Sequence, residues 1–369
     1  MKILMVSKAC YLATYRRKLV EMASLPGMDL TLMAPPYWRM GQKRALLEPG
    51  ETAGYRMLVE NPALNGHFHL HFYPQLGRLL AQLGPDLLHM DEEPYDLVTY
   101  LAVRGAIRRG VKVVFFTWQN LWREFPPPFG FMESYVLRRA QGAITGNAEA
   151  SDILRRKGYR GHLATIPQFG VDPEVFRPPE TSGQPRRFTI GFAGRMVKEK
   201  GIQVLLEAVA GLQGDWRLLL VGDGPLRQEI EGQAERLGIG SRVDFPGSFA
   251  SGDMPARYAE MDALVVPSLT VPHWKEQFGR VIIEAMACGV PVVGSDSGEI
   301  PNVIGDAGLV CPEGDSIALR ASLLRLMNSS GLRADLAQRG RARVLARYTQ
   351  RRVAEETVTL YQEVLGHTT

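Results

Sequence analysis

Two glutamates eight positions apart, Glu276 and Glu284, have the residue type and spacing that point most directly to chemistry. Phe278 and Gly279 open an apolar stretch that ends at Gly289, which predicts a helix starting between the two carboxylates. Helical spacing puts Glu284 a little under two turns into this helix and Glu276 just before its first turn. One carboxylate is therefore expected beside the helix start and the other inside the helix.

The first turn of such a helix has N–H groups without intrahelical partners, here those of Gln277, Phe278 and Gly279. These donors and the positive end of the helix dipole suit an oxygen-rich, negatively charged ligand such as a nucleotide sugar. A helix-and-strand packing unit with two surface glutamates is the alternative, because E-x7-E alone is a weak motif.

Two cations follow a strand predicted over Phe188 to Phe192. Gly194 and Gly201 flank Arg195 and Lys200, which places both cations between the strand and the next helix. A guanidinium fork and a mobile ammonium at this point would meet a diphosphate. A charged surface turn is the alternative.

Glycine also follows a second predicted strand, in Val221-Gly-Asp-Gly-Pro225. The segment lacks the third glycine of a dinucleotide-binding fingerprint, so Gly222 is expected in a tight turn that lines a cleft. The chain has no P-loop and no G-x-S-x-G motif. No two aspartates lie two positions apart, so the D-x-D pattern that holds a divalent metal on a nucleotide sugar is absent. We expect metal-independent chemistry and no cofactor.

His67, His69 and His71 alternate with other residues, which on a strand would place three imidazoles on one face. Three such ligands could make a zinc site. No carboxylate or cysteine lies beside them in the sequence, and a half-exposed edge strand explains the same alternation.

Asp91, Glu92 and Glu93 follow the strand predicted over Leu87 to Met90. At the end of a parallel strand they would face the binding crevice and bind acceptor hydroxyls. A solvated turn is the alternative.

The elements that position these residues form two alternations of strands and helices. A chain of 369 residues suits two domains, and 45% hydrophobic with 22% charged residues is typical of a soluble globular protein. The βαβ pattern predicts two Rossmann-like domains, joined by the polar stretch Glu180 to Arg187. We expect one domain over residues 1–180 with a last helix over about 350–369, and the other over residues 181–349.

The N-terminal residues 1–7 are an apolar run expected to form a strand rather than a signal peptide. The three cysteines are odd in number and lack metal spacing, which favours a reduced, cytoplasmic compartment. Residues 1–177 hold 22 Lys/Arg against 16 Asp/Glu, and the remainder holds 21 against 23. The basic half could contact anionic lipid at the inner membrane face, or its charges could form a solvated surface. Its clustered cations are Arg16, Arg17, Lys18, Arg39, Lys43 and Arg44.

Taken together, these motifs resemble the retaining glycosyltransferases of the GT-B fold, in the glycogen-synthase-like E-x7-E group. The resemblance is dense over residues 188–315, and Ile166-Pro-Gln-Phe-Gly-Val-Asp172 is similar to the group's interdomain signature. It implies an α/β fold of two facing Rossmann-like domains, with a C-terminal helix that crosses back to the first.

The resemblance also implies roles for named residues. Arg195 and Lys200 would bind the donor diphosphate, and Glu276 with the backbone of residues 277–279 would hold the donor sugar. Glu284 would bind the ribose. The donor would be UDP- or GDP-linked, and the acceptor a glycan, a lipid-linked molecule or a small molecule rather than a nucleic acid. A GT-B-fold epimerase, a glycan phosphorylase or a non-catalytic nucleotide-sugar-binding module are the alternatives.

Two departures from the group concern the acceptor side. The loop Ser7 to Ala13 lacks the paired glycines that many members have, and Gln119 stands where many have an active-site histidine. Gln119 therefore joins the candidate acceptor-side residues. The loop Leu269 to Lys275 is longer than usual, which would reshape the sugar pocket.

Overall fold

The computed structural model describes residues 1–179 and 187–366. Contacts divide the chain into unit 1, Met1–Gly170 with Gln350–Thr369, and unit 2, Val171–Thr349. The predicted linker, Glu180 to Arg187, lies outside the described residues except for Arg187. Among the described residues no helix combines the length and the apolar composition that crossing a bilayer requires.

The first crossing between the units, Gly170 to Val171, comes earlier in the chain than the predicted division at residue 180. The segment after it packs on unit 2. The N–H of Val171 donates to the carbonyl of Tyr348 at 2.8 Å, and the buried ring of Phe176 lies 6.5 Å from that of Tyr258. The last two residues of the segment that resembles the interdomain signature, Val171 and Asp172, thus belong to unit 2.

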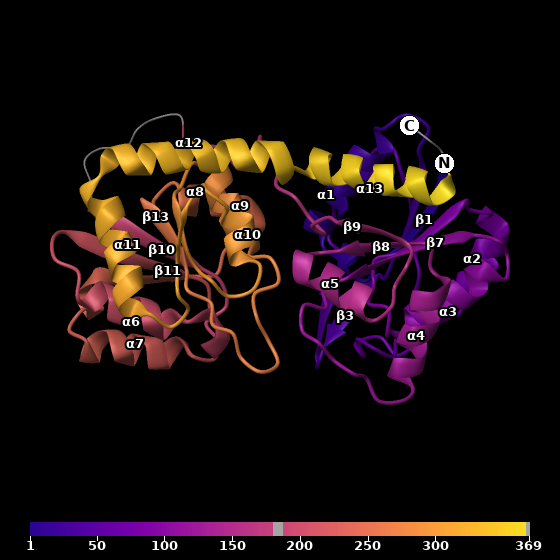
Figure 1. Ribbon diagram of the computed structural model, residues 1–369, viewed down its shortest axis with the longest axis horizontal. Coiled ribbons are helices and arrows are strands. Elements are labelled where there is room, and N and C mark those ends of the chain that lie inside the picture. The colour runs from indigo at the N-terminus through magenta and orange to yellow at the C-terminus, as the bar shows by residue number, and fades with distance from the viewer. Residues whose placement is uncertain (180–186, 367–369) are drawn as a thin grey trace. The chain divides into compact units, whose positions relative to one another are not determined.

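Unit 1 is built on seven parallel strands in the order β5-β2-β1-β6-β7-β8-β9. Residues alternate between the two faces of this sheet, as the pleat requires: Ile3 and Met5 pack with α1 and α13, whereas Leu4 and Val6 pack with α2 to α5. Figure 1 shows helices over the sheet, which buries both faces. The elements are β1 Lys2–Val6, α1 Ala13–Ala23, β2 Asp29–Ala34, β5 Arg56–Val59, α2 Leu76–Leu83, β6 Leu87–Met90, α3 Leu97–Ile107, β7 Lys112–Thr117, α4 Phe129–Arg139, β8 Gly142–Thr145, α5 Ala148–Arg156, β9 His162–Thr165 and α13 Gln350–Leu365.

Unit 2 repeats this architecture with six parallel strands in the order β12-β11-β10-β13-β14-β15. Ile190 and Phe192 of β10 belong to the core formed with α6, α7, α11 and α12, and Figure 1 shows α6, α7 and α11 together on that side. The elements are β10 Phe188–Ala193, α6 Ile202–Ala210, β11 Trp216–Val221, α7 Arg227–Arg236, β12 Val243–Gly247, α8 Met254–Tyr258, β13 Ala263–Val266, α9 Arg280–Ala287, β14 Val292–Ser295, α10 Ile300–Ile304, β15 Leu309–Cys311, α11 Ser316–Asn328 and α12 Ser330–Arg347.

The last helix, α13, belongs to unit 1 although it follows unit 2 in the chain. Its residues Val353, Tyr361 and Val364 join the core beneath α1. Tyr361 also hydrogen-bonds Nδ1 of buried His89 at 2.5 Å. The predicted return of the C-terminal helix to the first domain is thus observed in the contacts of unit 1.

Two features of unit 1 differ from the sequence prediction. An antiparallel hairpin that the sequence did not predict, β3 Tyr37–Met40 with β4 Lys43–Leu46, follows β2. The predicted histidine strand is wrong, because residues 67–71 form a turn in which the N–H of His71 donates to the carbonyl of His67 at 3.0 Å.

Candidate active site

A cluster of predicted site residues in unit 2 lies at the carboxyl ends of the strands. The strand order reverses at β10, because β11 pairs with one edge of it and β13 with the other. In open parallel sheets, ligands bind beyond the carboxyl ends of the strands at such a switch point. The loops after β10, β11 and β13 all meet there.

Two glycines let these loops approach one another. A Cβ on Gly222 would stand 1.9 Å from the carbonyl oxygen of Gly194, and a Cβ on Gly201 would stand 1.9 Å from that of Pro267. Both glycines have positive φ, 135° for Gly222 and 65° for Gly201, which side chains other than glycine rarely adopt. Gly194 and Gly222 therefore serve loop packing, and their contact with a donor stays a prediction.

Lys200 and Glu276, far apart in the sequence, meet at this edge of the sheet. Lys200 Nζ donates to Glu276 Oε2 at 2.6 Å, and Ser268 Oγ donates to the same oxygen at 2.9 Å. The Glu276 side chain is 9% exposed and that of Lys200 is 25% exposed. The ring of Trp274 lies 4.9 Å from the ammonium. A partly exposed cation is thus positioned by a buried carboxylate and an aromatic ring.

The other predicted donor residues do not all join this cluster. Arg195 lies on the loop after β10 with an exposed side chain, which makes no ion pair with the described residues. Phe278 is buried, with its ring 5.8 Å from that of Tyr348. Gly279, with a φ of 81°, caps the start of α9. Phe278 and Gly279 therefore fix the helix start, and the direct donor contacts expected of them stay predictions.

Glu284 lies in a hydrogen-bonded group of its own. Helix α9 begins at Arg280, so Glu284 stands one turn from its start rather than nearly two. Its Oε1 accepts from Arg280 Nε at 2.6 Å and its Oε2 from the Tyr258 hydroxyl at 2.7 Å. Burial raises the pKa of Tyr258 well above its usual value, and the Glu284 carboxylate raises it further. A ribose would have to share this carboxylate with Arg280 and Tyr258.

Of the acidic residues after β6 in unit 1, Asp91 and Glu92 are buried and Glu93 is partly buried, so the alternative of a solvated turn is wrong. Ser7 Oγ donates to Asp91 Oδ2 at 2.7 Å, and Glu92 forms a close ion pair with Lys8. Burial raises the pKa of Glu92 to about 7, although the charge of Lys8 opposes the shift. Asp91 and Glu92 are 4% and 3% exposed, so they support the loops rather than reach into solvent.

Glu93 accepts two hydrogen bonds from the loop after β7. The donors are Thr117 Oγ1 at 2.6 Å and the Trp118 N–H at 2.9 Å. Burial raises the pKa of Glu93 to about 7, and the two hydrogen bonds oppose this rise. The side chain thus joins the ends of β6 and β7.

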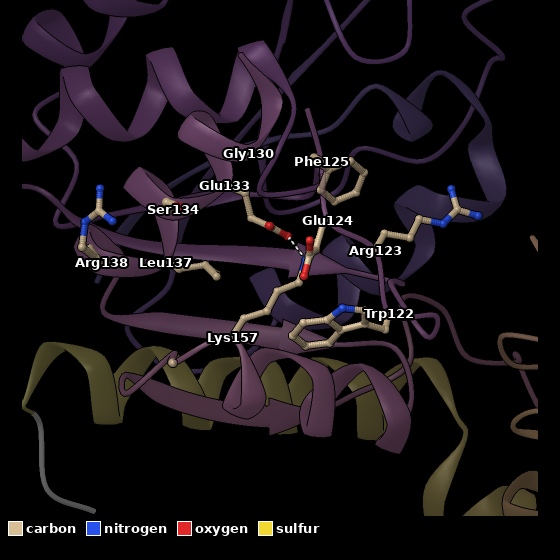
Figure 2. A pocket seen from close by; sticks show the side chains of 11 residues that line it. Trp122, Arg123, Glu124, Phe125, Gly130, Glu133, Ser134, Leu137, Arg138 and Lys157 are labelled. Carbon is tan, nitrogen blue, oxygen red and sulfur yellow. Dashed lines mark hydrogen bonds and ion pairs between the residues drawn. The ribbon is translucent and has the colours of Figure 1, made fainter. Parts of the chain in front are cut away.

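Gln119, from the same loop, is buried beside an ion pair at a cavity. Its Oε1 accepts from Lys157 Nζ at 3.3 Å, and Lys157 Nζ also donates to Glu133 Oε1 at 2.6 Å. The cavity has a volume of about 290 Å³, and Figure 2 shows the Lys157–Glu133 pair on its wall. Burial raises the pKa of Glu133, against the effect of Lys157. Trp122, Phe125 and Leu137 supply its apolar lining.

The three histidines do not share a face. His67 and His69 are exposed and His71 is buried, which lowers the pKa of His71 to about 4. His69 Nδ1 lies 2.8 Å from Asp96 Oδ1, a carboxylate that is 1% exposed. The described residues contain no group of three His, Cys, Asp or Glu side chains that could hold a metal ion. The sequence reasoning missed this pairing of His69 with Asp96.

The predicted basic cluster is partly wrong. Arg16 and Lys18 are 2% and 5% exposed, and Arg16 Nη1 donates to the carbonyl of Cys10 at 3.1 Å. Arg17 is paired with Glu51 at 2.7 Å. The exposed cations are Arg39, Lys43 and Arg44 of the β3–β4 hairpin.

The chain folds into two Rossmann-like units, each built on a parallel sheet, and Lys200 and Glu276 meet at the switch point of the second. Two such units define the GT-B fold class. Residues 178–343 match the family model "Glycosyl transferases group 1", and residues 12–169 match "Glycosyl transferase 4-like domain". The chain is 31% identical over 295 residues to MMP alpha-(1->4)-mannosyltransferase of Mycolicibacterium hassiacum, covering 77% of this chain and 69% of that protein. The chain therefore belongs to the glycosyl transferases group 1 family.

Other similarities agree with this family. The chain is 26% identical to 2-deoxystreptamine glucosyltransferase of Streptomyces kanamyceticus, covering 80% of this chain and 77% of that one. It shares its fold with Anabaena HepE, solved in complex with UDP, at a TM-score of 0.75 and 20% identity over 98% of this chain and 100% of that one.

Proposed function

We propose that the protein is a retaining hexosyltransferase that moves a hexose from a UDP- or GDP-sugar to an acceptor hydroxyl. The acceptor is a glycan, a lipid-linked molecule or a small molecule. The observation that carries the proposal is the Lys200–Glu276 pair at the switch point of unit 2. A mannosyltransferase and a glucosyltransferase among the relatives support a hexose donor, and UDP bound to HepE supports a nucleotide-linked one.

In the proposed donor site, Lys200 and Arg195 bind the diphosphate as a point charge and a planar fork. Glu276 and the backbone of residues 277–279 hold the sugar hydroxyls. Glu284 shares its carboxylate between the ribose and its present partners. Lys200 then exchanges one anionic partner, Glu276, for another, the phosphate.

The proposed reaction is a front-face displacement. The bond from the anomeric carbon to the leaving phosphate oxygen breaks, and the bond to the acceptor oxygen forms on the same face. The acceptor proton passes to the leaving phosphate. Because negative charge grows on that phosphate in the transition state, Lys200 and Arg195 supply the main electrostatic stabilisation without a metal ion.

A panel of UDP-, GDP- and ADP-sugars tests the donor by protection against thermal unfolding. Ligand at 100 times its Kd stabilises by about 2.7 kcal/mol, which is readily measured. NMR of the product then separates the alternatives: an α-linked product from an α-linked donor supports retaining transfer, and an epimerised free sugar nucleotide or a sugar phosphate refutes it. Loss of transfer on chelation with EDTA, restored by Mg²⁺, would refute the metal-independent mechanism.

We also propose peripheral contact with the inner face of an anionic membrane through the β3–β4 hairpin. Arg39, Lys43 and Arg44 are exposed there beside Met40 and Leu46, which are 54% and 68% exposed. Cations beside apolar side chains suit an anionic lipid surface. Vesicles containing phosphatidylserine should bind the protein at low salt and release it as salt rises. A Lys43→Glu and Arg44→Glu double variant that binds as well as the wild type would exclude the hairpin.

A further inference from the structure

We propose that His69, with Asp96, Tyr95 and Phe129, forms an acceptor subsite that binds a neutral polyhydroxylated ring, a sugar or a cyclitol. The inference rests on the proposed transferase function and names the acceptor class for it. All four residues belong to unit 1. In this subsite the imidazole Nε2 accepts a hydrogen bond from a ring hydroxyl.

The first observation is that one imidazole nitrogen is fixed while the other is available. His69 Nδ1 lies 2.8 Å from Asp96 Oδ1. The His69 side chain is 55% exposed whereas the Asp96 carboxylate is 1% exposed. A buried carboxylate that accepts from Nδ1–H leaves Nε2 as an acceptor. Within the described residues, Nε2 makes no hydrogen bond. The imidazole is therefore oriented by the protein and presents an acceptor to solvent.

The second observation is that His69 is held at the carboxyl end of the sheet. Its carbonyl accepts from the N–H of Leu97, the first residue of α3, at 3.0 Å. Asp96 precedes α3 in the loop after β6. Loops at the carboxyl ends of parallel strands carry the ligand contacts in open α/β sheets. The His69–Asp96 pair thus lies at the edge of the sheet where unit 1 is expected to bind its ligand.

The third observation is an aromatic frame around the imidazole. The ring centroid of Tyr95 lies 5.4 Å from that of His69, and the ring centroid of Phe129 lies 6.2 Å away. Both aromatic side chains are partly exposed. Apolar ring surface beside a hydrogen-bonding group matches a molecule with C–H faces and a hydroxyl edge. A sugar or cyclitol ring has this combination.

The charges around His69 favour a neutral ligand. Asp96 faces it directly, and Glu93 and Lys8 act on it from the loops after β6 and β1. Lys8 is the cation that acts on His69, but it is already engaged by Glu92 and lies 3.7 Å from Asp96. An anionic ring would meet more carboxylates than available cations here. A ring without charge avoids this repulsion.

The His69–Asp96 pair also gives the subsite a pH signature. The hydrogen bond to Asp96 raises the pKa of His69, while burial and Lys8 oppose the rise. A protonated imidazole donates at Nε2 where the neutral one accepts, so the ring hydroxyl must reverse its role and ring affinity should change as pH passes through the pKa of His69. Asp96→Asn should move this midpoint to lower pH. A purely structural role of His69 would not produce that shift.

The test combines an NMR titration of the wild-type histidine side chains with calorimetry of the wild type and the variants, each with methyl α-D-glucopyranoside and with myo-inositol. At least one ring should shift the His69 signals of the wild type, and His69→Gln should weaken its binding about tenfold, the equivalent of one hydrogen bond. His67→Gln is the matched control, because His67 is exposed on the same turn and bonds no described side chain. It should bind as the wild type does.

Three outcomes would overturn the proposal. They are no His69 shift with either ring, equal binding by the His69→Gln and His67→Gln variants, and tighter binding of glucuronate than of the neutral rings. Hydrolysis of UDP-glucose and GDP-mannose to water, measured on the same variants, separates this inference from the proposed function. A wild type that hydrolyses a sugar nucleotide but whose ring binding does not depend on His69 refutes only the subsite, whereas a wild type that neither hydrolyses nor binds any sugar nucleotide refutes the transferase itself.

Discussion

Two lysine–glutamate pairs in this molecule have the same geometry in different surroundings. Lys200 Nζ lies 2.6 Å from Glu276 Oε2, and Lys157 Nζ lies 2.6 Å from Glu133 Oε1. The Lys157 side chain is 8% exposed, whereas that of Lys200 is 25% exposed. Each ammonium also lies over an aromatic ring. The pairs therefore differ mainly in access to water and in their place in the sheet.

The difference in exposure bears on which of the two ion pairs can exchange a partner for a ligand. Lys157 and Glu133 have both lost most of their hydration, so each depends on the other, and exchange of partners is costly. Lys200 keeps part of its hydration at the switch point of a parallel sheet, where the proposed function has an anionic ligand replace Glu276. Partial exposure at a strand's carboxyl end, rather than pairing alone, distinguishes the pair that we propose for the site.

The largest expected effect is on stability, from breaking the buried pair. Glu133→Gln leaves the Lys157 ammonium buried without its counter-charge. The free energy of unfolding should fall by about 3–5 kcal/mol, measured by urea denaturation. The double variant Glu133→Gln/Lys157→Met should recover most of this loss, because it removes the unpaired charge. A loss in the single variant of under about 1 kcal/mol would show that this pair behaves like an exposed one.

Breaking the pair in unit 2 should instead reduce catalysis. Glu276→Ala should lower kcat about 10²- to 10³-fold, because the donor sugar loses its anchor and Lys200 loses its position. Glu276→Gln, which keeps shape and loses charge, should lie between alanine and wild type. Lys200→Ala should weaken both donor binding and turnover. Initial rates with the best donor of the panel measure these effects, and wild-type kinetics in either alanine variant would remove that residue from the site.

The fold could be predicted because its signals are local. Buried parallel strands are continuous apolar runs. The strand predicted over Leu87 to Met90 has the bounds that the structure gives, and the strand predicted over Phe188 to Phe192 differs from β10 by one residue at its end. Each of these elements is bounded by turn residues or by a change of hydrophobic period, which a sequence displays directly.

The site was less predictable because its contacts join distant loops. Lys200 and Glu276 were both named, but their direct pairing follows from the meeting of two loops at the switch point. The alternation of His67, His69 and His71 has the period of a strand. The structure has a turn there instead, and the neighbouring Asn65 accepts a hydrogen bond from the N–H of Arg39, which joins this turn to the β3–β4 hairpin. Arg16 is buried because backbone carbonyls receive its guanidinium, which charge patterning does not indicate.

A smaller effect is expected from pH, and it concerns the buried carboxylates of unit 1. Burial raises the pKa of Glu93 from 4.5 to about 7. The stability that this shift contributes is fully present below pH 4.5 and is lost as pH rises through about 7. Glu93→Gln should abolish this part of the pH dependence, of order 1–3 kcal/mol, in thermal unfolding between these pH values. Glu124→Gln, at an exposed carboxylate of the same unit, is the control, and an unchanged pH profile in Glu93→Gln would refute the assignment.

The smallest expected effect is on UDP affinity, and it comes from removing the aromatic ring beside each lysine. Trp274 lies 4.9 Å from the Lys200 ammonium, and two backbone hydrogen bonds with Val271, of 2.8 and 3.1 Å, fix its loop. A cation–π contact contributes about 0.5–2 kcal/mol, so Trp274→Ala should weaken UDP binding about 2- to 30-fold in calorimetry. Trp122→Ala is the matched control, because Trp122 lies 5.8 Å from Lys157 in unit 1 and should leave UDP affinity unchanged. Equal losses in both variants would indicate general destabilisation. An unchanged affinity in Trp274→Ala would mean that Glu276 and Ser268 alone position Lys200 for the diphosphate.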